Sequence, residues 1–414
     1  MQKYSIIQSL NLPEYKIERI IKQNAEEIHF EIRAYKRKKM ICSGCGECHT
    51  QSIHGFTKVV VEDLRLLNQR VYLHVIKRRQ WCPSDGKTHV EQIEWLETRA
   101  TVTKRYAKEI YRLTSITTNQ EAGWYLRMDD EKIYRIDKAI LEKLFEERLN
   151  PTPVSKNNSV DEVAWKKHHR YLTNVIDADE KVVIWNAKGR KSEVLDKYYK
   201  SLGEKNCLAI ESVAMDGAKT YISSTKKNAT NALIVLDKFH IVQKASNAAD
   251  KVRRDELSKA RKNKDAELIA LTSCKQRFIL LKKKKNLTER QSLSLNKLCK
   301  INQPIYRAML LKEDFLQVYD FENVEDAEQH LYDWIDQALF SGLEPMFEFA
   351  CSVLYKMQYI LNWYKKRISS AISEGFNNKI KRLKRMAYGY RDIEYFKLKI
   401  HQHCGYLNPK RFSH

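Results

Sequence analysis

The chain has 414 residues, of which 43% are hydrophobic, so it can bury sizeable cores and is not a disordered polymer. The formal net charge of +23 predicts an extended polyanionic partner, for which nucleic acid is a better candidate than an acidic membrane surface. No apolar run reaches the roughly 20 residues that span a bilayer, and residues 1–16 lack the apolar core of a secretory signal, so we expect a protein of the reducing cytoplasm with no membrane partner.

The first part of the chain is expected to be a small β module built around cysteines. Residues 27–40 alternate apolar and polar side chains like a strand, and residues 71–81 form a second strand-like run that leads into Cys82. Cys42 and Cys45 form a C-x-x-C pair on a glycine-containing turn. Because two such turns bring soft ligands to one tetrahedral ion, the pattern predicts a zinc-ribbon-like site for Zn²⁺. Free thiols in a small β domain are the alternative.

The sequence leaves the fourth zinc ligand open. Asp85 stands where the second turn would carry its second cysteine. We favour His89 as the ligand, with Asp85 as its rival, and Cys48 and His49 are further candidates. The predicted zinc ligands are therefore Cys42, Cys45, Cys82 and His89.

Residues 102–148 have a helical character in three segments, 103–115, 118–128 and 129–149. Asp129 or Asp130 is suited to cap the third segment. Three short helices joined by brief turns are typical of a helix-turn-helix DNA-binding domain. An ordinary helical linker domain is the alternative.

An α/β arrangement is expected after a linker rich in proline, serine and asparagine at 150–160. The strand candidates are 160–165, 169–177, 181–187, 207–216 and 232–240, with a helix at 193–202 between the third and the fourth. This order predicts a sheet with helical cover. From about 243 to 400 nearly every segment has a helical pattern, and residues 251–300 hold 16 Lys and Arg against 5 Asp and Glu.

Three aspartates mark the ends of the predicted strands. Asp161 begins a strand directly after the linker, whereas Asp216 and Asp237 each end a later one. Carboxylates that converge at one sheet edge provide the hard oxygen ligands that a two-metal phosphoryl-transfer site requires. Helix caps and solvent-facing turn residues are the alternative for one or two of them.

From Ser373 to Arg391 the C-terminal segment contains one acid, Glu374, among six lysines and arginines. Helical spacing places four apolar residues on one stripe and four polar residues on another. The apolar stripe consists of Phe376, Ile380, Leu383 and Ala387, and the polar stripe of Glu374, Asn378, Lys381 and Arg385. The carboxylate and the cations therefore share a face, where Glu374 is also suited to the first turn of a helix.

Several motifs of this chain are long and specific. They are Asp161-Glu162, KGRKSE at 188–193, MDGAKTY at 215–221, DKFHIVQKASNAADKVRR at 237–254 and SEGFNNKIKRLKRMAYGYRD at 373–392. Together with the cysteine module, they resemble the bacterial ISL-three family of insertion-sequence transposases. The resemblance implies a DDE transposase with an RNase H-like catalytic sheet interrupted by a helical insertion. Such proteins cut and join the terminal repeats of their own element with Mg²⁺, for which Mn²⁺ can substitute.

Carried over residue by residue, the resemblance makes Asp161 the first catalytic acid and Glu374 the third. Asp216 is favoured as the second acid because the corresponding aspartate follows the fourth strand. Asp237 is its rival, and Asp237 with His240 resembles the acid and histidine that follow the fifth strand in related transposases. These three acids, Asp161, Asp216 and Glu374, are also the implied Mg²⁺ ligands. Glu162 points to the opposite strand face and is expected to be structural.

The basic residues are expected to hold double-stranded DNA, both element ends and target. The residues named for this role are Arg253, Arg254, Lys381, Arg382, Lys384, Arg385 and Arg391. The expected domains are a zinc-ribbon-like module (1–98), a helix-turn-helix domain (99–150), the first part of the RNase H-like core (151–242), a basic helical insertion (243–360) and the last core helices with Glu374 (361–414). A homodimer on paired ends, at the bacterial nucleoid, is expected. A DNA-binding regulator with a non-catalytic RNase H-like domain, and a nuclease that cuts without joining, are the alternatives.

Overall fold

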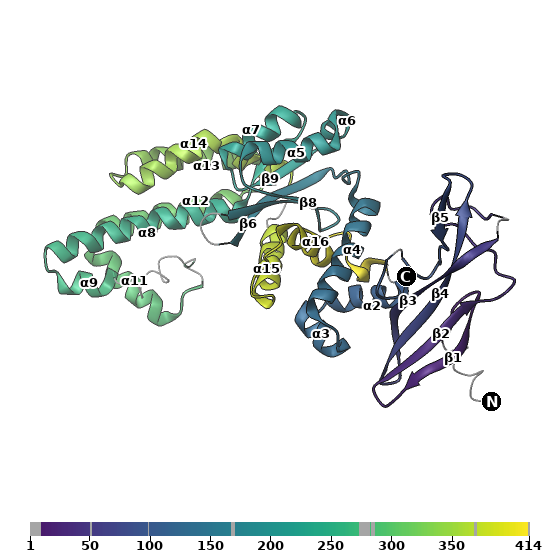
Figure 1. The fold of residues 1–414 in the computed structure, drawn as a ribbon. Coiled ribbons are helices and arrows are strands. Elements are labelled where there is room, and N and C mark those ends of the chain that lie inside the picture. The colour runs from purple at the N-terminus through teal and green to yellow at the C-terminus, as the bar shows by residue number, and fades with distance from the viewer. Residues whose placement is uncertain are drawn as a thin grey trace. The chain divides into compact units, whose positions relative to one another are not determined.

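The computed structural model divides the chain into two compact units, Met1–Leu144 and Phe145–Phe412 (Figure 1). It describes residues 10–49, 52–97, 99–166, 170–272, 282, 286–367 and 371–412. Within these ranges no helix has the length and apolar character needed to cross a membrane.

The first unit contains a five-stranded sheet. Its strands are β1 (Tyr15–Gln23), β2 (Glu27–Ala34), β3 (Ile53–Leu66), β4 (Gln69–Cys82) and β5 (Lys87–Val90). Their order is β1-β2-β4-β3, with β5 paired to β4, and β2 and β4 run parallel. Alternating side chains of β2 and β4 form its core, where Phe30 and Leu73 face each other and are fully buried. The strands predicted within 27–40 and at 71–81 are confirmed.

Three helices complete this part of the chain: α2 (Lys104–Thr114), α3 (Asn119–Leu126) and α4 (Asp130–Leu149). Thr103 caps α2, and Thr118 forms a reciprocal capping box with Glu121 on α3. Of the two candidate caps for α4, Asp129 accepts from the Lys132 amide at 3.0 Å. The caps explain why three short helices begin at these residues.

The second unit is built on a mixed sheet. Its strands are β6 (Asn157–Lys166), β7 (Arg170–Asp177), β8 (Val182–Lys188), β9 (Ser212–Met215) and β10 (Leu233–Leu236), in the order β10-β9-β6-β7-β8. β6, β7 and β8 form an antiparallel meander, whereas β9 and β10 run parallel to β6. The connecting helices are α5 (Ser192–Leu202), α6 (Glu204–Leu208) and α7 (Lys219–Asn228). The predicted strand at 207–216 is wrong in its first half, since α6 ends at Leu208 and β9 begins at Ser212.

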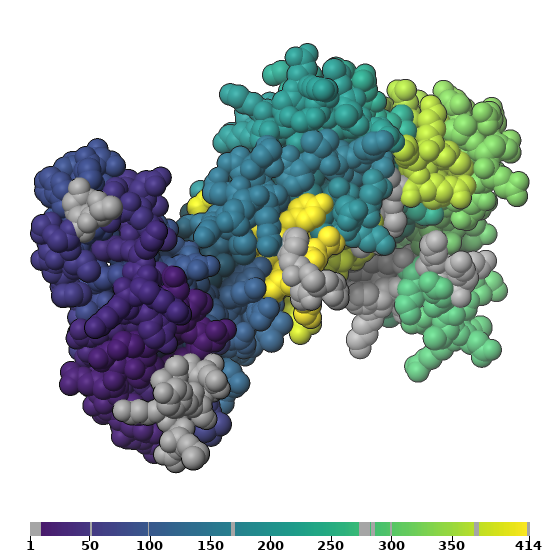
Figure 2. Space-filling model, turned by 90° about the vertical axis from the view of Figure 1, so that its right-hand side faces the viewer, coloured from purple at the N-terminus to yellow at the C-terminus, as the bar shows by residue number. Residues whose placement is uncertain are grey.

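The rest of the unit is helical. The longer helices are α8 (Lys238–Lys262), α9 (Ala266–Thr272), α11 (Glu289–Ile301), α12 (Gln303–Leu316), α13 (Val324–Leu339), α14 (Glu344–Lys365), α15 (Ala371–Met386) and α16 (Ile393–Cys404), with short 3₁₀ turns at Gln317–Tyr319 and Pro409–Phe412. α9 and α11 lie at the end of α8 away from the sheet and form a lobe in the space-filling view (Figures 1 and 2). α8 begins at Lys238 because Asp237 accepts from the Phe239 amide, so β10 ends before the predicted boundary at 240.

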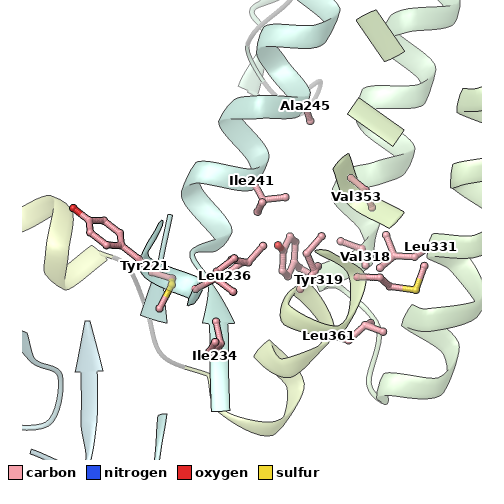
Figure 3. Packing of buried hydrophobic residues seen from close by; sticks show 14 of the residues in the cluster. Tyr221, Ile234, Leu236, Ile241, Ala245, Val318, Tyr319, Leu331, Val353 and Leu361 are labelled. Carbon is pink, nitrogen blue, oxygen red and sulfur yellow. The ribbon is translucent and has the colours of Figure 1, made fainter. Parts of the chain in front are cut away.

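One hydrophobic cluster joins the sheet to the helices that follow it. Leu236 of β10, Ile241 of α8 and Tyr319 of the 3₁₀ turn lie close together in this cluster, which also includes Leu361 of α14 (Figure 3). The other sheet face packs against α15 and α16, where Ile380 is buried at 1% exposure. The predicted apolar stripe of α15 is thus confirmed at its centre, and the sheet is held between two helical layers.

Trp334 is the largest fully buried side chain of the second unit's core. Its Nε1 donates to the Leu311 carbonyl at 2.7 Å, and its ring lies 4.8 Å from that of Phe315. Trp334→Ala should cost about 3–5 kcal/mol of unfolding free energy, because it leaves a large cavity. Urea unfolding followed by circular dichroism measures this loss. Tyr332→Ala, on the same helix at 48% exposure, should change the midpoint little, and equal effects would contradict the packing role.

Candidate functional site

Strand register aligns the three aspartates at one sheet edge. Val160 of β6 pairs with Met215 of β9, and Met215 pairs with Leu236 of β10. The residue that follows each of these is an aspartate, namely Asp161, Asp216 and Asp237. Because all three strands are parallel, the aspartates lie side by side, with Asp216 in the middle.

His240, in the first turn of α8, contacts two of these carboxylates. Its Nε2 lies 4.0 Å from an Asp161 oxygen and 3.5 Å from an Asp237 oxygen. The neighbouring Asp161 carboxylate and the negative charges of Asp237 and Asp216 raise the pKa of His240, although burial opposes them. The structure therefore brings together four of the predicted residues, Asp161, Asp216, Asp237 and His240.

Helix α15 approaches Asp161 from the opposite end of the sequence. The Asn377 side chain donates to Asp161 Oδ2 at 2.6 Å, and the hydroxyls of Ser373 and Ser159 lie 2.5 Å apart. Glu374 is exposed and lies about 60° around the helix from Asn377. Among the described residues Glu374, in the first turn of α15, has no hydrogen-bond or ion-pair partner. Asn377 lies within the motif at 373–392, but its spacing alone does not identify this contact.

Glu162 lies on the other face of β6. It accepts from the Tyr221 hydroxyl at 3.2 Å, and that hydroxyl lies 2.9 Å from Thr173 Oγ1. Burial raises the pKa of the Glu162 carboxyl, and the charges of Asp216 and Asp161 raise it further. The network fits the structural role that we expect for this residue.

The predicted DNA-binding cations fall into two groups. The exposed ones are Arg254, Lys381, Arg382, Arg385 and Arg391. Arg253 is wrongly assigned, since it is 2% exposed and donates to Asp250 and to the Thr272 carbonyl inside the α8–α9 packing. Lys384 is half-buried and donates to the Ala164 carbonyl at 2.7 Å, which ties α15 to β6. Residues 273–281 and 283–285 of the basic run lie outside the described residues.

Two tight turns form the candidate zinc site of the first unit. In the first, the Gly46 amide donates to the Cys42 carbonyl at 2.9 Å, and the Gly44 amide points to Cys42 Sγ. In the second, which follows β4, the Gly86 amide donates to the Cys82 carbonyl at 3.0 Å. Each turn presents a cysteine sulfur toward the other, as in a zinc ribbon.

The fourth residue of this cluster is His49 rather than His89. The ligand atoms of Cys42, Cys45, His49 and Cys82 all lie within 4.8 Å of one another, and His49 Nε2 is 3.0 Å from Cys45 Sγ. His89 instead pairs with Asp85 at 2.7 Å, and its ring packs over Gly44, where a Cβ would lie 2.7 Å away. Neither of the two favoured candidates therefore joins the cluster. Three thiols and one imidazole are a common donor set for structural Zn²⁺.

Comparisons with known proteins identify the class. A family model described as "Transposase", for the ISL3 DDE transposases, matches residues 159–400, and one described as the zinc-finger of transposases IS204/IS1001/IS1096/IS1165 matches residues 38–85. The second match includes His49 and ends before His89.

Among the relatives, the transposase of insertion sequence element IS1001 from Bordetella parapertussis is 32% identical over 366 residues, which cover 88% of each chain. The IS1557 transposase of Mycobacterium tuberculosis (strain CDC 1551 / Oshkosh) is 27% identical over 348 residues, 78% of this chain and 76% of the relative. The family match and the IS1001 alignment each cover more than half of the chain. The chain belongs to the ISL3 family of DDE transposases.

Zinc content tests the ligand set. Cys45→Ser and His49→Ala should each lower the zinc bound per chain, because a three-ligand site holds structural zinc less tightly. Inductively coupled plasma mass spectrometry of the purified full-length protein measures the zinc bound per chain. His89→Ala is the matched control and should retain its zinc; zinc lost from His89→Ala but kept in His49→Ala would reverse the assignment.

The raised pKa of Glu162 predicts how the stability of the folded protein changes with pH. A carboxyl whose folded pKa is raised binds more protons in the folded state, so stability falls as pH rises from the ordinary value of 4.5 through the folded pKa. Glu162→Gln removes this loss and keeps an acceptor for Tyr221, so its melting temperature relative to wild type should increase from pH 4 to pH 8. The exposed Glu328→Gln, on α13, should show a flat difference. A flat difference for Glu162→Gln as well would contradict the raised pKa.

Proposed function

We propose that this protein binds the terminal inverted repeats of an insertion sequence and catalyses metal-dependent DNA cleavage and strand transfer. The observation that carries the proposal is the row of Asp161, Asp216 and Asp237. Helix α15, which contacts Asp161 through Asn377, also carries Glu374 in its first turn. The relatives named above are transposases of insertion sequence elements, which supports the same substrate class.

The sheet supports an RNase H-like catalytic core. Three antiparallel strands form a meander, and two further strands are added parallel to the first, which is the order such a sheet has. In this arrangement the first strand is central and the fourth lies directly beside it. A catalytic acid on the first strand and another after the fourth are therefore neighbours.

The proposed metal ligands are Asp161, Asp216 and Glu374. Carboxylate oxygens are hard donors of the kind that Mg²⁺ and Mn²⁺ prefer, so the residues fit these ions. When bound, the ions supply positive charge at the phosphate under attack. The protein's own part is to hold the carboxylates in place, and Asn377 does so at Asp161 through its 2.6 Å hydrogen bond.

Asp216 is preferred to Asp237 as the second acid. β9 is adjacent to β6, so Asp216 stands about 5 Å along the sheet from Asp161, whereas β10 and Asp237 are about 10 Å away. Asp237 is 8% exposed, caps α8 and lies 3.5 Å from His240. These contacts suit a residue that positions α8 and His240 beside the metal ligands.

The remaining elements are assigned to DNA binding. Helices α2, α3 and α4 fit a helix-turn-helix domain, and the exposed cations Lys381, Arg382, Arg385 and Arg391 would contact phosphates near Glu374. The zinc cluster would stabilise the turns of the first unit. Two element ends must be paired, so a homodimer is the proposed active form.

Labelled duplexes carrying the inverted repeat that flanks the gene test the function. Incubation with Mg²⁺ or Mn²⁺ should cut at the element end, and added target DNA should yield joined products. Cleavage without joining would make the protein a nuclease, and binding alone a DNA-binding regulator.

Substitutions test the acids. Asp161→Asn, Asp216→Asn and Glu374→Gln should each slow cleavage at least about 1,000-fold, because each removes several kcal/mol of transition-state stabilisation, and should leave repeat binding intact. Glu328→Gln is the matched surface control. Single-turnover cleavage gives the rates, and a larger loss for Asp237→Asn than for Asp216→Asn would exchange their roles.

A further inference from the structure

Three lysines from separate helices gather at the turn that follows β9. Lys356 of α14 donates to the Gly217 carbonyl at 2.9 Å, and Lys244 of α8 donates to the Asp216 carbonyl at 3.4 Å. Lys219 begins α7 directly after the turn, and its ammonium lies 5.7 Å from the ring centroid of Tyr355. We call Lys219, Lys244 and Lys356 the lysine cluster.

The lysine cluster is not neutralised by the protein. None of the three ammonium groups forms an ion pair with a carboxylate among the residues that the structure describes. Burial lowers the pKa of Lys356, and the charges of Lys244 and Lys219 lower it further, whereas Asp216 opposes the shift. Since three like charges repel one another, such a cluster is stabilised by binding an anion.

The backbone at this turn is also suited to an anion. Ala218 is the N-cap residue of α7 and offers no side-chain acceptor. The Tyr221 amide donates to the Ala218 carbonyl at 3.1 Å, so the amides that remain as possible donors in the first turn are those of Lys219 and Thr220. Gly217 has a φ of +79°, and a Cβ there would lie 2.9 Å from Leu236 and 3.6 Å from the Lys356 ammonium. The glycine therefore permits the left-handed turn and its close packing against Leu236, which place the Gly217 carbonyl where Lys356 donates to it.

The lysine cluster adjoins the row of acids. Asp216 belongs both to the row of acids and to the turn that the lysines contact. Its carboxylate accepts a hydrogen bond from the Ala218 amide, and its backbone carbonyl accepts one from Lys244. Lys244 follows His240 by four residues, so both lie on one face of α8. An anion bound by the lysine cluster would therefore lie next to the row of acids, but it would contact the lysines rather than the acids.

We propose that Lys219, Lys244 and Lys356 bind a DNA phosphodiester next to the one that is cut, and so set which bond reaches the acids. This inference rests on the proposed function, and it names a positioning contact within it. The phosphate belongs either to the element end or to the target strand, and the experiment below distinguishes the two. The exposed Tyr355, at 70% exposure, would then lie beside the bound strand.

Neutral phosphates combined with lysine variants test the proposal. Methylphosphonates are placed singly at each phosphate within a few nucleotides of the cut, first in the element end and then in the target. Cleavage is measured with the first set and joining with the second, for wild type, Lys219→Gln, Lys244→Gln and Lys356→Gln. Lys227→Gln, an exposed lysine at the other end of α7, is the matched control.

A methylphosphonate at one position should slow the wild-type reaction about tenfold or more. The same methylphosphonate should cause little further slowing in the Lys356→Gln or Lys244→Gln protein, because the lysine contact is already lost. That position identifies the bound phosphate and the strand it belongs to. Lys227→Gln should keep the full wild-type penalty at the same position. Lys219→Gln changes an exposed side chain, so it keeps the test valid if a half-buried variant fails to fold.

Additive penalties at every phosphate in both DNAs would overturn the lysine site while leaving the transposase assignment intact. Absence of any cleavage by the wild type would instead contradict the proposed function itself. A wrong cut position in the lysine variants, at an unchanged overall rate, would further support the positioning role.

Discussion

The parallel pairing of β6, β9 and β10 is the constraint on which the site depends. It aligns Val160, Met215 and Leu236, and therefore the aspartates that follow them. A slip of one residue in either pair would move an acid to the opposite face of the sheet. The register is fixed because both faces are buried, and because Asn362 of α14 donates to the Ile234 carbonyl at 2.8 Å, which binds the edge strand to its helical cover.

The two helical layers contribute different side chains to this sheet edge. The layer formed by α15 and α16 brings Asn377 to Asp161, across more than 200 residues of sequence. The layer formed by α7, α8 and α14 brings His240 to Asp161 and Asp237, and the lysine cluster to the turn at Asp216. Helices α8, α12, α13 and α14 share one hydrophobic core with the sheet, whereas α9 and α11 pack in a separate cluster.

Local patterns in the sequence predicted much of this architecture. Period-two and helical spacing located β6, β7, β8 and α15, and strand ends located the three aspartates. Contacts between residues that are far apart in the chain could not be predicted from these local patterns. His49 and His89 each lie a few residues from a cysteine. The fold shows that His89 pairs with Asp85, whereas His49 joins the three cysteines. Arg253 looked like part of a basic surface because its partners, Asp250 and the Thr272 carbonyl, become neighbours only when α8 packs against α9. The lysine cluster joins residues up to 137 positions apart, from Lys219 to Lys356, so no spacing could indicate it.

Charge explains why acids and lysines share one turn. A DNA strand brings phosphates that a bare row of carboxylates would repel, and divalent ions offset this only at the acids themselves. The neighbouring phosphate needs its own partner, and the lysines beside Asp216 have no carboxylate of the protein to satisfy them among the described residues. At the Asp216–Gly217 turn, the Asp216 carboxylate belongs to the row of acids while the two backbone carbonyls accept from Lys244 and Lys356. The turn therefore couples the position of a proposed metal ligand, Asp216, to the positions of two ammonium groups, and movement of one would displace the other. On this view the backbone between them, rather than either side chain alone, determines which phosphodiester meets the acids.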